Sequence, residues 1–196
     1  MFRDKLSDIL ERNGGIITTK DAQSAGISRP SFMAYVNENG LTRIAHGVYS
    51  SDESWPDIFR QLQMQYPSVI FSHESALFLH DLAEREPDPV SVTVKTNYHS
   101  ASMSRYRLQV YYVNIDLFEI GLTEKFSPTG YRVRCYDVER TVCDMIRSYN
   151  SVDNQELTAA LKAYIRKENR NIPLLMRYGE KFRITSKLKT YMEVLL

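Results

Sequence analysis

The chain has 196 residues, 43% of them hydrophobic and 25% charged, which suits one large or two small folded domains and indicates neither a disordered nor a coiled-coil protein. No apolar run approaches the roughly 18 residues of a membrane span, and no apolar signal region follows Met1–Lys5, so we expect a cytoplasmic protein without membrane contact. The net charge is only +1, but residues 150–196 carry 9 bases against 5 acids and residues 51–149 carry 10 against 14, so these regions are expected to meet different partners.

The first segment predicts two helices. Residues 2–13 place apolar side chains at helical spacing, and Gly14-Gly15 ends the predicted helix. Thr18 and Asp21 have the spacing of a capping box, which predicts a short second helix over residues 19–24.

A third helix is predicted directly after a tight turn. Gly26 permits a left-handed backbone, and Ser28 can cap a helix that runs to Gly40. Met33 and Val36 then give this helix an inner face. The face that we predict to be exposed carries Ser28, Arg29, Ser31 and Tyr35. Two helices joined by so short a turn predict a helix-turn-helix.

Two short strands follow and complete a predicted winged helix-turn-helix. They cover residues 41–44 and 48–50 around a turn at 45–47. The side chains expected beside the recognition helix are Thr42, Arg43 and His46. Bases outnumber acids here, and a helix N-terminus adds partial positive charge, which favours phosphate binding. A scaffold or protein-docking module is the alternative, because helix-turn-helix units also serve packing.

The polar segment 51–54 is predicted to separate two domains. We expect a winged helix-turn-helix DNA-binding domain over residues 1–52 and a larger α+β domain, with a mixed sheet and a helical end, over residues 53–196. In the larger domain, β-rich patterns predict strands near residues 68–71, 90–94, 106–114 and 131–135. The strand at 106–114 is almost uncharged, so it is expected to be central in the sheet or covered by a partner.

The larger domain offers no complete catalytic or metal site. The candidate ligands His73, Glu74, His80 and Asp81 lack a supporting partner, and an acidic helix start explains Glu74. Asp88, Thr93 and Lys95 resemble a metal-dependent nuclease pattern, but threonine replaces its second acid. Cys135 and Cys143 lack metal-binding spacing. We therefore expect no enzyme activity, metal or cofactor.

Charged residues of the C-terminal half give two further candidate contacts. Arg140 and Asp144, four residues apart on a predicted helix, suggest a surface ion pair or, as the alternative, a contact to a partner or between domains. Three more helices are predicted after residue 153. They carry a basic face that is either simply solvated or touches DNA phosphates or a negatively charged partner: Lys162, Arg166, Lys167, Lys187 and Lys189.

The sequence resembles the AbiEi-type antitoxins of bacterial type IV toxin–antitoxin systems. In the N-terminal winged helix, the resemblance rests on Gly26-Ile27-Ser28, Gly40-Leu41 and the run from Arg43 to Tyr49. Residues 72–77 and 137–144 look like two recurrent C-terminal segments of that family.

This resemblance implies a function. It implies a DNA-binding autorepressor of a toxin–antitoxin operon involved in abortive infection and phage defence. The implied partners are operator DNA with inverted repeats and a nucleotidyltransferase-like toxin, which the antitoxin counters without forming a stable complex. A protein-binding module, or a regulator without antitoxin activity, remains the alternative.

Overall fold

The computed structural model divides into two compact units. It describes residues 2–51, 57–98 and 100–195. Unit 1 comprises residues 1–67 and 127–131, and unit 2 comprises residues 68–126 and 132–196. The predicted boundary between residues 52 and 53 lies outside the described residues and stays a prediction.

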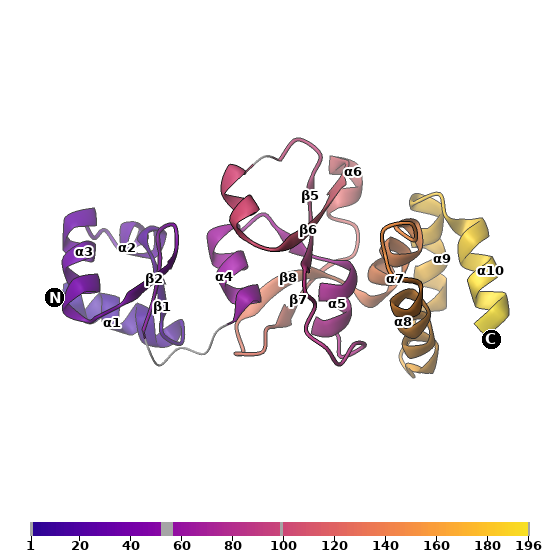
Figure 1. The fold of residues 1–196 in the computed structure, drawn as a ribbon, viewed down its shortest axis with the longest axis horizontal. Coiled ribbons are helices and arrows are strands. Elements are labelled where there is room, and N and C mark those ends of the chain that lie inside the picture. The colour runs from indigo at the N-terminus through magenta and orange to yellow at the C-terminus, as the bar shows by residue number, and fades with distance from the viewer. Residues whose placement is uncertain (1, 52–56, 99, 196) are drawn as a thin grey trace. The chain divides into compact units, whose positions relative to one another are not determined.

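Unit 1 contains a winged helix-turn-helix, as predicted (Figure 1). Its elements are α1 (Phe2–Arg12), β1 (Ile16–Thr18), α2 (Thr19–Ser24), α3 (Arg29–Glu38), β2 (Thr42–Ala45) and β3 (Val48–Ser50). The capping box that opens α2 is confirmed, because the Thr18 hydroxyl accepts from the Asp21 amide and the Asp21 carboxylate accepts from the Thr18 amide. Gly26 has a φ of 74° in the turn before α3, as its place in the sequence suggests.

The three strands form an antiparallel sheet in the order β1-β3-β2. β1 was not predicted, because its three residues are too few to show a periodicity. The helices and the sheet enclose one apolar core, in which Phe32 and Tyr49 meet edge to face with ring centroids 5.4 Å apart. This core fixes α3 and the β2–β3 wing on one scaffold.

Unit 1 extends beyond the wing. Helix α4 (Ile58–Gln65) begins at Asp57, whose carboxylate accepts from the Arg60 amide and from Thr129. The Arg60 guanidinium donates to the Gly14 carbonyl at 3.0 Å and lies over the Tyr131 ring. These contacts explain why α4 and residues 127–131 group with the winged helix-turn-helix.

Unit 2 is built on a mixed five-stranded sheet, as predicted. Its strands are β4 (Ile70–Phe71), β5 (Val90–Lys95), β6 (Leu108–Val113), β7 (Leu122–Phe126) and β8 (Arg132–Tyr136), in the order β6-β5-β4-β8-β7. β4 pairs in parallel with β8 and β5 with β6, and the other neighbours are antiparallel. Of the two alternatives predicted for β6, the central position is wrong, because β6 forms one edge of the sheet, and coverage by a partner stays a prediction.

Helices complete unit 2. The shorter ones are α5 (His73–Leu79), the 3₁₀ helix η1 (Ala101–Arg105) and α6 (Ile115–Phe118), and the C-terminal ones are α7 (Val138–Arg147), α8 (Asn154–Arg166), α9 (Ile172–Lys181) and α10 (Thr185–Leu195). The C-terminal four, coloured from orange to yellow in Figure 1, pack around a core that includes Val142, Leu161 and Leu188. Within the described residues, no helix has the length and apolarity needed to cross a membrane.

Candidate nucleic-acid interface

The start of α3 is a capped and exposed corner of unit 1. Ser28 caps the helix by accepting from the Ser31 amide, and its hydroxyl lies 2.9 Å from the Ser31 hydroxyl. Pro30 occupies the first turn, and Arg29 projects from the same turn with an exposed side chain. The helix N-terminus therefore presents a cation and two hydroxyl groups beside its own partial positive charge.

The wing turn is fastened to the start of α2. The Thr19 amide donates to the Gly47 carbonyl at 2.8 Å. Gly47 has a φ of 71°, and a Cβ at this position would lie 2.6 Å from the Thr19 hydroxyl oxygen. Only glycine fits both the backbone and the close approach, so the position of the wing depends on this residue.

The wing and the recognition helix share one concave surface. It is lined by the start of α3 and by the wing, including Ser28, Arg29, Arg43 and His46. Arg43 Nη2 lies 3.1 Å from His46 Nδ1, so the arginine donates to a ring nitrogen that accepts. The structure thus brings together four of the seven predicted DNA-binding residues. Ser31 is bonded to Ser28, and Thr42 is exposed on β2 outside this lining.

The predicted exposure of Tyr35 is wrong. Its side chain is only 2% exposed, and its hydroxyl lies 3.0 Å from the Ser7 hydroxyl on α1. Tyr35 lies in the core with Phe32 and Val36, because positions three and four apart share a helix face. The outward positions are instead Ala34 and Asn37, with Met33 half-buried, and spacing counted from Phe32 would have found them.

Glu38, the acid on α3, forms an ion pair with Arg3 on α1. Both oxygens of the Glu38 carboxylate accept from the Arg3 guanidinium, at 2.7 and 2.9 Å. This hydrogen-bonded pairing lowers the pKa of Glu38 below its ordinary value. The recognition face therefore keeps its positive character, because the acid's charge is balanced within unit 1.

Arg140 does not lie on a surface. Its ion pair with Asp144 is present at 2.8 Å, but both side chains are fully buried, which makes the prediction of a surface pair or a partner contact wrong. The guanidinium also donates to the Leu117 and Ile120 carbonyls and lies over the rings of Tyr136 and Phe182. Arginine packs in this way because its planar, always charged group can meet carbonyls, a carboxylate and aromatic faces together. These contacts of Arg140 lie within unit 2 and give no support to the other alternative, a contact between domains.

The predicted basic residues of the C-terminal helices lie on two elements. Lys162 and Arg166 are exposed on α8, Lys167 follows them half-buried, and Lys187 and Lys189 are exposed on α10. Lys187 Nζ lies 3.9 Å from the centroid of the Tyr149 ring.

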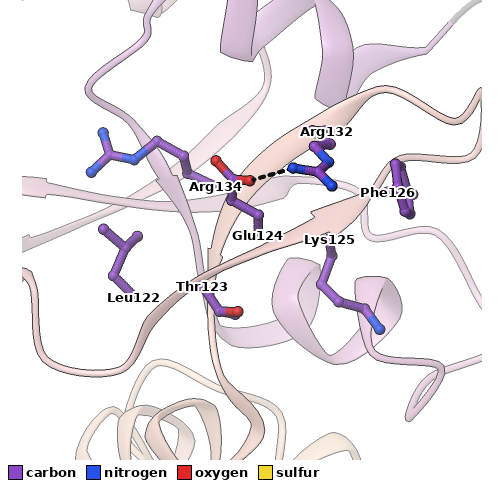
Figure 2. A pocket seen from close by; sticks show the side chains of 7 residues that line it. All are labelled: Leu122, Thr123, Glu124, Lys125, Phe126, Arg132 and Arg134. Atoms are coloured by element: carbon purple, nitrogen blue, oxygen red, sulfur yellow. Dashed lines mark ion pairs between the residues drawn. The ribbon is translucent and has the colours of Figure 1, made fainter.

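A second polar surface lies on the β7–β8 hairpin, and its lining includes Arg132 and Arg134. Figure 2 shows Glu124 between these arginines, with Leu122 and Phe126 towards the two ends of β7. Arg132 Nη1 lies 3.5 Å from Glu124 Oε2. Phe126 is 62% exposed, a feature that the sequence pattern did not indicate.

The two histidines among the candidate metal ligands hydrogen-bond within the fold. His73 is fully buried, with its ring nitrogens 3.0 Å from the Ser72 and Ser148 hydroxyls, and His80 Nε2 donates to the Tyr136 carbonyl. The part of the chain that the structure describes contains no group of three or more His, Cys, Asp or Glu able to hold a metal ion.

Comparisons with known proteins give one similar fold for most of the chain and one family match for its N-terminal segment. No curated protein matches the chain. The fold is similar to the crystal structure of the RV2827C protein from Mycobacterium tuberculosis, with a TM-score of 0.59 and 13% identity over 91% of this chain and 71% of that chain. At this identity the likeness concerns the fold alone.

A family model described as "Transcriptional regulator, AbiEi antitoxin" matches residues 4–51. The resemblance seen at residues 72–77 and 137–144 lies outside this match and stays a prediction. The segment from Asp4 to Ser51, which forms the helix-turn-helix and the wing, therefore carries the domain of the AbiEi antitoxin family of transcriptional regulators.

Proposed function

We propose that this protein is a type IV antitoxin that represses its own toxin–antitoxin operon by binding inverted repeats in the operator. The observation that carries the proposal is the shared concave surface of helix α3 and the wing, where Arg29, Arg43 and His46 converge. The match of residues 4–51 to a family of transcriptional regulators supports the same function.

In this proposal the elements have separate roles on DNA. Ser28, Arg29 and Ser31 enter the major groove with the start of α3, and Asn37 lies farther along the exposed face. Thr42, Arg43 and His46 hold the phosphate backbone or the adjacent minor groove from the wing. Tyr35 has no part in this contact, because it is buried.

Binding to DNA from directly upstream of the gene tests the assignment. Arg29→Ala should weaken operator binding by about 1–3 kcal/mol, the usual cost of removing a side chain that reads a base, and Arg29→Ala with Arg43→Ala should weaken it further. Arg12→Ala is the matched control, because it removes one positive charge from α1. An unchanged operator affinity for the double variant would sink the assignment. Nuclease footprinting should show two protected half-sites.

The antitoxin activity is assigned to residues 53–196, because the exposed surface of the winged helix-turn-helix is already assigned to DNA binding. The target is a nucleotidyltransferase-like toxin, countered without a stable complex. Toxin and antitoxin should be expressed from unrelated promoters, so that repression does not contribute. The double variant Arg29→Ala/Arg43→Ala should still rescue growth, whereas alanine substitutions at Lys162, Arg166 and Lys167 should weaken rescue.

The outcomes separate the two activities. Loss of rescue by the Arg29→Ala/Arg43→Ala protein would place antitoxicity in the winged helix. Failure of the unaltered protein to oppose any neighbouring toxin would leave a regulator without antitoxin activity.

A further inference from the structure

The two edges of the unit 2 sheet differ in how they are protected. Edge strands expose unpaired backbone groups, and proteins usually guard them with charged side chains, proline or bulges. β7 carries Glu124 and Lys125 at its edge. β6 has the sequence Leu-Gln-Val-Tyr-Tyr-Val, with no charge and no proline, and its pairing with β5 has no bulge.

The free hydrogen-bonding groups of β6 can be assigned from its register. The Arg107 and Val113 carbonyls accept from β5, so the odd-numbered residues of β6 face β5. The amides and carbonyls of Leu108, Val110 and Tyr112 therefore point away from the sheet. No other described residue hydrogen-bonds to these three backbones.

The side chains at this edge are also exposed and apolar. Tyr112 is 57% exposed, and Ile115, at the start of the following helix, is 66% exposed. An uncharged strand with open backbone groups and exposed apolar side chains is the surface that a second strand would cover.

We propose that β6 is a self-association edge, at which two copies of this chain pair their β6 strands antiparallel about a two-fold axis at Val110. In this register Leu108 lies opposite Tyr112 of the second copy, and Val110 lies opposite its own equivalent. All outward groups of the three residues are then satisfied.

Charge favours a second copy at β6 and disfavours one at β7. Self-pairing of β6 brings only uncharged side chains of the strand together. Self-pairing of β7 about its centre would place Glu124 opposite Glu124. The β6 interface is short, so the dimer is weak and forms at high concentration. A two-fold dimer has the symmetry of an inverted repeat, but the inference depends on the sheet edge alone.

Sedimentation equilibrium of the full chain, at roughly 1 µM to 1 mM, tests the edge. The unaltered protein should pass from monomer to dimer over this range. Tyr112→Lys should abolish the dimer, because it sets a charge in the apolar ladder. Phe126→Lys, a matched change of an exposed aromatic on the β7 edge, should leave it intact. A protein that stays monomeric, or dimerisation abolished by Phe126→Lys, overturns the proposal.

Disulfide trapping tests the register. Opposed hydrogen-bonded residues have Cα atoms about 5.5 Å apart, so Val110→Cys should link two copies on mild oxidation. Tyr112→Cys should not, because four residues of offset separate it from its equivalent by roughly 13 Å. The native Cys135 and Cys143 are buried and do not compete. Non-reducing gels that show linkage for Tyr112→Cys but not Val110→Cys would refute the proposed register.

Discussion

At the scale of single residues, His73 makes the stability of unit 2 depend on pH. Burial is the main cause that lowers its pKa from 6.5 to about 4, so the folded protein keeps the ring neutral where an unfolded chain protonates it. His73 therefore does not lower the free energy of unfolding above pH 6.5, and it lowers this free energy progressively as the pH drops from 6.5 towards 4. The total loss from this group is about 3 kcal/mol.

Urea unfolding at pH 7 and pH 5 measures this dependence. The unaltered protein should lose about 2 kcal/mol from His73 between these values, as part of its total change. His73→Gln, which cannot titrate, should lose correspondingly less. Equal losses in the two proteins would show that the ring is not held neutral by the fold.

Arg140 is expected to be one of the costliest residues to replace. Arg140→Met would leave the Asp144 carboxylate without its buried partner at Nε and free the Leu117 and Ile120 carbonyls. Removing one member of a buried pair costs about 3–5 kcal/mol. Arg132→Met is the control, because it breaks an exposed ion pair worth under about 1 kcal/mol. Similar urea midpoints for the two variants would contradict this account.

Sequence spacing predicted the Arg140–Asp144 pair but not its burial. A spacing of four residues places two side chains on one helix face, whatever that face contacts. Arg140 is buried by segments that lie far away in the sequence. These are the turn before β7 and Phe182 after α9. Tyr35 was misplaced for a related reason, since a tyrosine suits either a core or a surface and only packing against Ser7 decides.

At the scale of elements, Gly47 is expected to control the wing. In Gly47→Ala the new methyl group would displace the wing from Thr19, so operator affinity should fall together with stability. Gly40→Ala is the matched control, because Gly40 also has a positive φ but a Cβ there meets nothing within 4 Å. This control should lose about 1–2 kcal/mol of stability and keep its operator affinity.

A second substitution separates the clash from the backbone strain. Adding Thr19→Ala to Gly47→Ala removes the hydroxyl that the methyl group meets, so part of the operator affinity should return. If the double variant binds no better than Gly47→Ala, strain alone moves the wing.

Local signals predicted the elements of unit 1 well. Capping pairs and glycine turns act within a few residues, so α2, α3 and the β2–β3 hairpin could be derived from the sequence. Strand order is a long-range property. An uncharged run such as β6 is compatible with a central or an edge position, and only its pairing partners decide.

At the scale of the whole molecule, the basic residues of α8 and α10 are predicted to touch DNA that flanks the operator. Alanine at Lys162, Arg166 and Lys167 should reduce the slope of log affinity against log salt by about 0.9 for each phosphate that these side chains no longer neutralise. Arg107→Ala with Arg132→Ala is the control, because both arginines lie in exposed ion pairs of unit 2. If the triple variant keeps the slope of the unaltered protein, the basic residues of α8 do not contact DNA.

Unit 1 is formed by two separate stretches of the chain, and this affects how its winged helix could be exchanged for that of another protein. Asp57 holds Thr129, and Arg60 reaches both Gly14 and the Tyr131 ring, so unit 1 draws on two separate stretches of the chain. In a chimera that exchanged only residues 1–52, Asp57 and Arg60 would keep Thr129 and Tyr131, but Arg60 would meet a foreign residue in place of Gly14, where a Cβ would lie 3.0 Å from its Nη1. Grafting a new operator specificity onto this scaffold therefore requires an incoming winged helix that keeps a glycine at position 14, or a redesign of Arg60 to fit the residue that replaces it.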